Sequence, residues 1–187
     1  MQPDVARDLG DSARAFRDLV WPAVARWCGG GEIVPMEGVA DSRFARSVDT
    51  LSGVDAWQLC PDRGAMRGIA SRVQFGAKAW PSFTLRERRA SGAETELAKR
   101  LAALADPRRC WLLPALTVHG YVSARRDGRL LYAAVAYTHE LCGLVRDGTP
   151  GQDYERRTVH SDGNVFVVVW VERLRALGLR VRAVDER

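Results

Sequence analysis

The chain begins with apolar residues spaced three and four positions apart, a pattern typical of an amphipathic helix. Between residues 5 and 27 these positions are Val5, Leu9, Ala13, Phe16, Val20, Val24 and Trp27. We expect Pro22 to kink this helix, because proline has no N–H to donate to the preceding turn. The glycines at 29–31 should end it, and a short edge strand is predicted for residues 32–35.

Two alternating segments follow, separated by a turn rich in proline, aspartate and glycine. The first, residues 53–59, places Asp55 on the same strand face as two large apolar side chains. The second, residues 67–75, places Arg72 and Gln74 on one face. Antiparallel pairing of these strands would bring Asp55, Arg72 and Gln74 into one polar cluster.

The rest of the chain reads as alternating strands and helices. Residues 82–88 alternate as a third strand, and a capping-box pattern at 91–94 predicts a helix over residues 92–105. An Asp-Gly pair at 127–128 predicts a hairpin. The further expected elements are strands at 116–123 and 130–137, a helix at 138–145 capped by Thr138, an exposed loop at 149–163, a strand at 165–170, a helical turn at 171–177 and a last strand at 179–184.

This order of elements predicts an α+β fold with a mixed, mostly antiparallel sheet flanked by helices. A chain of 187 residues suits one domain, residues 1–187, and its 47% hydrophobic and 27% charged content is ordinary for a globular protein. No segment is long and apolar enough to cross a bilayer, and the first residues lack the apolar core of a signal peptide. We therefore expect a cytoplasmic protein with no membrane partner.

The net charge of +5 comes mostly from arginines, which cluster at 86–109 and 125–129. The planar guanidinium fork suits phosphate, so nucleic acid is an expected partner. A solvated surface rich in arginine through codon bias is the alternative. The expected contacts surround a strand-to-helix junction, where a helix N-terminus favours anions, and are Arg86, Arg88, Arg89, Lys99 and Arg100.

Several common catalytic signatures are absent from the sequence. It contains no GxSxG, P-loop or GxGxxG motif, which removes simple hydrolase, NTPase and dinucleotide-binding interpretations. The three histidines, His119, His139 and His160, lie far apart without cysteines or carboxylates at metal-ligand spacing, so each is predicted to be structural.

The hairpin that carries Gly53-Val54-Asp55 and ends in Arg72-Val73-Gln74 resembles the metal-binding hairpin of the PD-(D/E)XK nuclease superfamily. The helix before it, and the strand and helix after it, suit that family's αβββαβ core, so the resemblance spans about residues 5–123. It implies a restriction-endonuclease-like core, cleavage of DNA or RNA phosphodiesters, and Mg²⁺ or Mn²⁺ as cofactor.

In that family a strand aspartate, matched here by Asp55, binds the metal, and a Glu or Gln two positions from a Lys completes the site. Gln74 and Arg72 match the second pair in reversed order, without an acidic ligand. Mg²⁺ takes one or two carboxylates together with waters and phosphate oxygens, so Asp49 or Glu96 would supply a second. The alternatives are a structural ion pair of Asp55 with Arg72 and an ordinary i,i+3 pair of Glu96 with Lys99.

Three functions remain open from the sequence. The first is a metal-dependent nuclease that uses Asp55, Gln74 and Arg72. The second is a non-catalytic module of the same fold that binds nucleic acid or a partner protein. The third is a small-molecule enzyme or toxin built on the pocket of Asp55 and Arg72, which would need only one or two arginines for a single anionic group, whereas a polyanion needs a continuous basic track.

Overall fold

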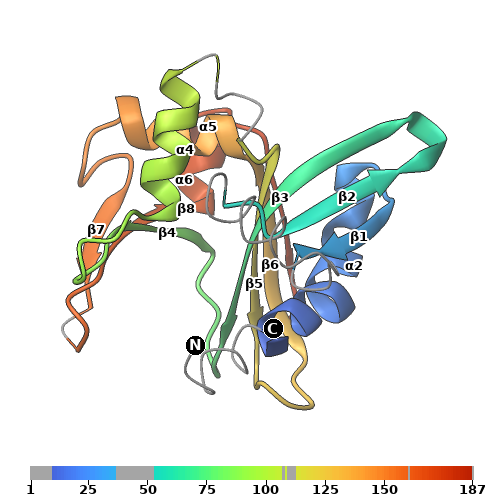
Figure 1. Ribbon diagram of the computed structural model, residues 1–187. Helices are drawn as coiled ribbons and strands as arrows, with labels where there is room; N and C mark the ends of the chain where they lie inside the picture. Colours follow the sequence, from blue (N-terminus) through green and yellow to red (C-terminus); the bar gives the residue numbers. More distant parts are fainter. Residues whose placement is uncertain (1–9, 37–52, 107, 109–112, 160, 187) are drawn as a thin grey trace.

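Two β-sheets and the helices around them make up the protein. The structure is a computed structural model that describes residues 10–36, 53–106, 108, 113–159 and 161–186 (Figure 1). These residues form a single α+β domain with a mixed sheet, which confirms the fold class expected from the sequence.

The larger sheet has six strands in the order β1-β2-β3-β5-β6-β9. Neighbouring strands run antiparallel except β3 and β5, which are parallel. The predicted hairpin is confirmed, because β2 and β3 pair directly with Ala56 opposite Ile69. The strands of this sheet are β1 (Glu32–Pro35), β2 (Ala56–Cys60), β3 (Ala65–Phe75), β5 (Leu116–Val122), β6 (Leu130–Tyr137) and β9 (Val181–Asp185).

The smaller sheet is antiparallel, with the order β4-β8-β7, and corrects the expectation of a single sheet. Its strands are β4 (Ser82–Arg88), β8 (Val165–Trp170) and β7 (Glu155–Thr158). Alternation predicted β4 correctly but says nothing about its partner, which is β8 and not the neighbouring hairpin. The sequence of β7 is Glu-Arg-Arg-Thr, without an apolar position, so this strand was expected to be part of a loop.

The N-terminal helical segment is described from Gly10 to Cys28 and changes its winding around Pro22. A π-helical turn, Phe16–Val20, leads into α2 (Trp21–Val24) and a 3-10 turn, Ala25–Cys28. The π turn ends two residues before Pro22, which cannot donate a backbone hydrogen bond. Gly29 then adopts a left-handed conformation with φ of 84° and ends the segment, as expected.

Two predicted helix caps are wrong. Helix α4 (Glu96–Ala105) begins after Thr95, whose Oγ1 accepts the Ala98 N–H at 3.2 Å, so the pattern at 91–94 does not form its cap. Helix α5 (Thr138–Asp147) has no side-chain cap, because the Thr138 hydroxyl lies 2.9 Å from that of Thr117 on β5. In α4 a hydroxyl nearer the helix provides the cap, whereas in α5 a tertiary contact with β5 engages the Thr138 hydroxyl. A further helix, α6 (Val171–Ala176), follows β8.

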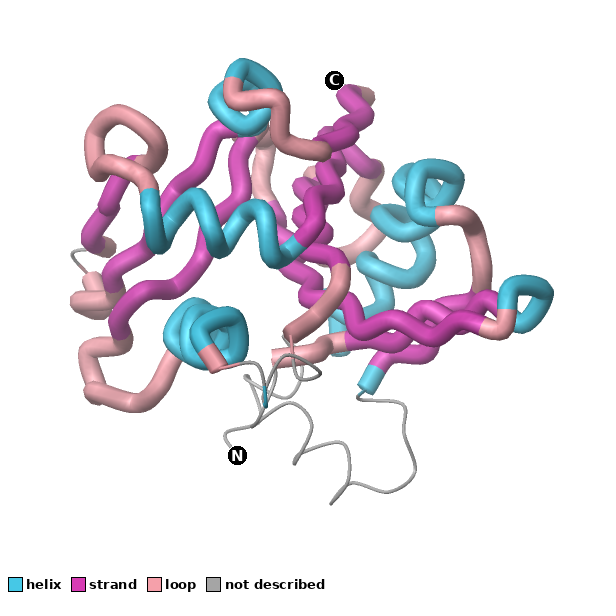
Figure 2. The backbone as a smooth tube through the Cα atoms, turned by 90° about the horizontal axis from the view of Figure 1, so that it is seen from above, coloured by secondary structure: helices cyan, strands magenta, loops and turns pink. Residues whose placement is uncertain are grey.

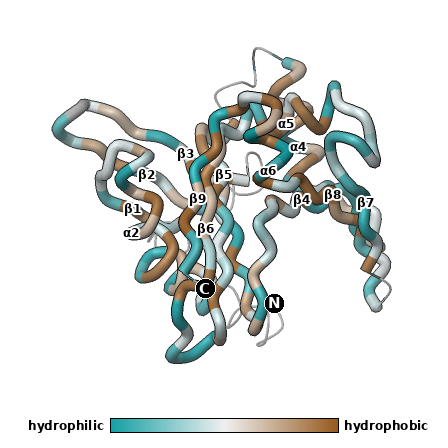
Figure 3. Tube along the Cα trace, turned by 180° about the vertical axis from the view of Figure 1, so that it is seen from behind, coloured by the Kyte–Doolittle hydropathy of each residue, from teal (hydrophilic) through white to brown (hydrophobic). Residues whose placement is uncertain are grey.

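The six-stranded sheet lies between two hydrophobic clusters. On one side Phe16, Val20 and Val24 of the helical segment pack on Ile69 and Val118, and Gly120 lets Val20 approach the strand because a Cβ there would collide with it. On the other side are the three-stranded sheet and helices α4, α5 and α6 (Figures 1 and 2). The turn joining β5 and β6, away from both clusters, is hydrophilic (Figure 3). Among the described residues, no helix combines the length and apolar composition needed to cross a membrane.

Candidate functional site

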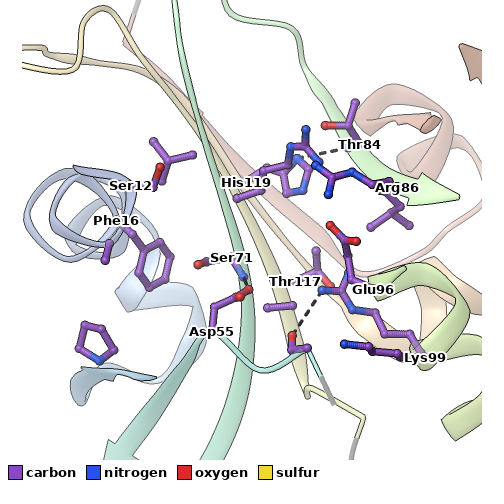
Figure 4. Close-up of a pocket in the computed structure, with 18 of the residues that line it drawn as sticks. Ser12, Phe16, Asp55, Ser71, Thr84, Arg86, Glu96, Lys99, Thr117 and His119 are labelled. Carbon is purple, nitrogen blue, oxygen red and sulfur yellow. Dashed lines mark hydrogen bonds between the residues drawn. The ribbon is translucent and has the colours of Figure 1, made fainter. Parts of the chain in front are cut away.

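A cavity of about 430 Å³ lies where β2 separates from β3 (Figure 4). Strand β2 pairs with β3 only as far as Ile69, whereas β3 continues along β5 to Phe75. Residues 70–73 of β3 line the cavity together with parts of the N-terminal helix, β4, β5 and α4. The polar and charged lining residues beyond Ser12 are Asp55, Ser71, Arg72, Thr84, Arg86, Arg89, Glu96, Lys99, Arg100, Thr117 and His119.

Asp55 occupies the point of separation. Its N–H donates to the Ile69 carbonyl at 2.9 Å, and its Oδ2 accepts the Ser71 N–H at 2.6 Å. The carboxylate therefore accepts a hydrogen bond from the β3 backbone just beyond the last residue pair of the two strands. This contact gives Asp55 a structural role in addition to any ligand that it binds.

The predicted cluster of Asp55, Arg72 and Gln74 forms only in part. Asp55 and Arg72 both line the cavity. Gln74 is on the same face of β3 as Arg72, but its Nε2 donates to Thr84 Oγ1 at 2.7 Å, and it is not among the lining residues. Gln74 therefore joins the two sheets at the border of the site.

Four of the five predicted nucleic-acid contacts come together in the cavity. Arg86 lies near the end of β4 and Arg89 directly after it, and Lys99 and Arg100 come from the first turns of α4. Arg88 is exposed and is not among the lining residues, since the strand register shifts between Arg86 and Arg88. With Arg72, five cations share this cavity with two carboxylates, those of Asp55 and Glu96.

Several hydrogen-bonding groups of this cluster are buried and unused. The Nε atoms of Arg86, Arg89 and Arg100 have no hydrogen-bond partner among the described residues, and neither has Glu96 Oε2. Arg100 is only 4% exposed, and its Nη2 reaches the Gly53 carbonyl at 3.5 Å. The ion pair between Arg89 Nη2 and Glu96 Oε2 is long at 3.9 Å. Because buried polar groups are normally paired, these N–H groups are available to an acceptor that enters the cavity.

Electrostatics in the cavity favour a negative ligand. Burial, and then the neighbouring Arg86 and Arg100, lower the pKa of Arg72, while Glu96 opposes this shift. The pKa of His119 lies well below its usual range because the ring is buried, with Arg72 and Arg100 adding to the effect. His119 is therefore neutral near pH 7, and its Nδ1 accepts the Thr84 N–H at 3.3 Å, which puts the ring proton on Nε2.

An aromatic ring orients two of the arginines. The guanidinium carbons of Arg72 and Arg86 lie 4.8 and 5.4 Å from the centre of the Phe166 ring. Cation–π contacts of this kind fix the plane of a guanidinium while leaving its N–H edge free to bind. Phe166 belongs to β8, so a strand of the second sheet helps to position these two cavity arginines.

The described residues provide limited ligands for a metal. No group of three or more His, Cys, Asp or Glu side chains that could hold a metal ion is found among them. Asp49, one of the predicted ligands, lies outside the described residues. Asp55 and Glu96 do line one cavity, and two carboxylates are within the number that Mg²⁺ uses together with waters and phosphate oxygens.

His119 and Phe166 are site residues that sequence reasoning missed. His119 was interpreted as structural because it lacks metal-ligand spacing, but a histidine two residues after Thr117 in a buried strand marks a polar strip. The parallel register places it directly opposite Arg72, a pairing that no local pattern reveals. Nothing in the apolar run 165–170 distinguishes Phe166 from its neighbours.

Comparisons with protein-family models, curated proteins and solved structures find no match to this chain. The resemblance to PD-(D/E)XK nucleases therefore stays a prediction, and the cavity is the basis for the proposed function.

Proposed function

We propose that the protein binds nucleic acid and that a backbone phosphate enters the cavity beside Arg86, Arg89 and Arg100. The observation that carries this proposal is the set of three buried Nε–H groups without a partner among the described residues. A phosphate offers several acceptor oxygens, and charge-assisted hydrogen bonds from arginine to phosphate are among the strongest in proteins. Binding would also relieve the repulsion among the cavity cations.

The distribution of charge favours a polyanion over a small anion. Arg88 continues the basic surface outside the cavity on β4, and Arg157 on β7 is also exposed. The whole chain carries a net charge of +5. A nucleic acid can contact the cavity and these outer arginines together, whereas one small anion would contact the cavity only.

Salt dependence of binding tests this proposal. For three phosphates neutralised on a single strand, a fourfold rise in salt should weaken binding about twentyfold. Fluorescence anisotropy with a labelled oligonucleotide measures the slope. The variants Arg86→Gln and Arg89→Gln should each weaken binding and reduce the slope by about one contact.

Arg146→Gln is the matched control, because Arg146 is an exposed arginine on α5 that pairs with Asp147 at 2.7 Å away from the cavity. It should bind like the wild type. Absence of binding at low salt, or equal losses in all three variants, would contradict the proposal. Binding of inorganic phosphate alone, with no affinity for oligonucleotides, would favour the small-molecule interpretation.

Metal-dependent cleavage of the bound phosphodiester is a second candidate function. It is favoured by Glu96 Oε2, a buried carboxylate oxygen without a hydrogen-bond partner among the described residues, in the same cavity as Asp55 and Lys99. The order of elements gives it partial support, because the helical segment, β1, β2, β3, α4 and β5 follow an αβββαβ order. The strand expected to complete that core, β4, lies instead in the second sheet.

In this candidate function Asp55 and Glu96 would hold Mg²⁺ or Mn²⁺, which when bound supplies an activated water and stabilises charge on the phosphate. Arg86, Arg89 and Lys99 would orient the phosphate. Cleavage that needs a divalent ion, and that Glu96→Gln abolishes while oligonucleotide binding persists, supports the enzyme. Binding without cleavage at any divalent ion concentration leaves the protein as a binding module.

A further inference from the structure

We infer that the face of the three-stranded sheet that carries Phe166 and Trp170 is a stacking surface for the unpaired bases of single-stranded nucleic acid. This inference rests on the proposed binding of phosphates in the cavity and names the form of nucleic acid that the protein holds. It concerns a surface that extends from the cavity along β8 to the loop before β4.

The two faces of this sheet differ in composition. Phe83, Leu85, Val167 and Val169 are fully or almost fully buried and point to the core beneath α4 and α5. The pairing register places a different set on the opposite face, namely Ser82 and Thr84 with Arg86 on β4, Phe166 and Val168 with Trp170 on β8, and Glu155 with Arg157 on β7. Val168 and Ser82 of that face are buried, and the Ser82 hydroxyl lies 3.4 Å from that of Tyr121 on β5. Phe166 and Trp170 are partly exposed and lie beside arginines.

Phe166 connects this face to the cavity. Its ring lies beneath Arg72 and Arg86, which both line the cavity. Trp170 is four residues further along the same strand and face, about 13 Å away at the rise of a β-strand. A strand of nucleic acid whose phosphate enters the cavity can therefore extend its neighbouring bases over these rings.

A second tryptophan completes the surface. Trp80, in the loop that leads into β4, is 51% exposed and meets Trp170 edge-to-face with 6.5 Å between ring centres. Together with residues 77–81 Trp170 lines a hollow of about 450 Å³. A large aromatic side chain is costly to leave in water, and a cluster of such side chains commonly marks a binding surface.

Charge identifies the occupant. Arg157 lies 5.6 Å from the centre of the Trp170 ring, and Arg72 and Arg86 flank Phe166, so each ring of the strand has a cation beside it. The acid of this face, Glu155, is engaged by Trp170 Nε1 at 2.6 Å and Arg157 Nη2 at 2.6 Å. Aromatic rings interleaved with arginines fit a chain of bases and phosphates. An apolar peptide or a second copy of this basic chain would not supply negative charge to pair with these arginines.

Stacking requires unpaired bases, so the test compares two probes with the same phosphates. The first is a labelled single-stranded oligonucleotide, and the second is the same backbone with abasic positions throughout. The wild type should bind the first more tightly. Trp80→Leu should weaken binding of that probe by roughly five- to hundredfold, which is the range expected when one base–aromatic stacking contact is lost. It should leave the affinity for the abasic probe unchanged.

Trp80→Phe is the matched control because it keeps an aromatic face at the same position, and it should retain most of the preference for the base-bearing probe. Phe166→Leu, on the sheet itself, should repeat the effect of Trp80→Leu. Equal affinity of the wild type for both probes, or equal weakening of both by Trp80→Leu, would overturn the inference while leaving phosphate binding intact. The inference would also be overturned if the wild type were a dimer that Trp80→Leu dissociates without changing the affinity for the base-bearing probe. No binding of either probe at low salt would overturn the proposed function itself.

Discussion

Replacing Asp55 separates its structural role from its charge. Its Oδ2 accepts the Ser71 N–H at 2.6 Å where β2 leaves β3, in a part-buried position. Asp55→Ala leaves this backbone donor without that acceptor, and a buried donor stranded in this way costs about 1–3 kcal/mol. Asp55→Asn keeps an oxygen that can accept the same N–H and removes only the negative charge.

We therefore expect Asp55→Ala to lower the free energy of unfolding by about 2 kcal/mol and Asp55→Asn to lower it by less. The second variant still loses the attraction between the carboxylate and the five cavity cations. Urea denaturation followed by circular dichroism measures both differences. Asp62→Asn, in the exposed turn between β2 and β3, is the control and should unfold like the wild type.

The same variants affect binding in the opposite direction. Removing a negative charge from the cavity should strengthen the binding of an oligonucleotide by Asp55→Asn in the absence of divalent ions, because the charge opposes the phosphate. If Asp55 also holds a metal, that variant should lose divalent-dependent cleavage. Asp55→Ala unfolding at the same urea concentration as both Asp55→Asn and the wild type would refute the structural reasoning.

Two further predictions concern stability. Burial lowers the pKa of His119 in the folded state, so the unfolded chain binds more protons below about pH 6.5. The free energy of unfolding should therefore be highest above that pH and should be lower by about 1.4 kcal/mol at pH 5.5. Urea melts at both pH values check this, and His119→Gln should remove the loss while the half-exposed control His139→Gln keeps it. Gly120→Ala should lower the free energy of unfolding by about 1–3 kcal/mol, because its Cβ collides with Val20. Gly143→Ala has open space around a helical position of α5 and should raise that free energy by up to about 1 kcal/mol. Thermal melts that rank the two glycine variants the other way would contradict the packing described for β5.

Local patterns predicted the elements of this fold well. Alternation and turn residues placed β2 and β3, and the helical spacing placed α4 with Glu96 and Lys99 on it. These signals depend on neighbouring residues only, so they survive without knowledge of the tertiary structure. The candidate residues Asp55 and Arg72 were found for this reason.

Contacts between distant segments were not predictable in the same way. The pairing of β4 with β8 joins residues about eighty positions apart, and the parallel register of β3 with β5 places His119 opposite Arg72. Gln74 was expected in the site from its place on the strand, but its side-chain amide donates a hydrogen bond to Thr84 of the second sheet. The cavity is therefore the meeting point of two sheets that sequence analysis treated as one.

The most direct test of the proposed phosphate site observes the arginine Nε–H groups themselves. In ¹⁵N-labelled protein, the Nε–H signals of Arg86, Arg89 and Arg100, assigned through single Arg→Lys variants, should shift and exchange more slowly with water when an oligonucleotide is added at low salt. The Nε–H signal of Arg146, which donates to Asp147 at 2.7 Å, should stay unchanged. Unchanged signals for the three cavity arginines under conditions where the oligonucleotide is fully bound would contradict the account.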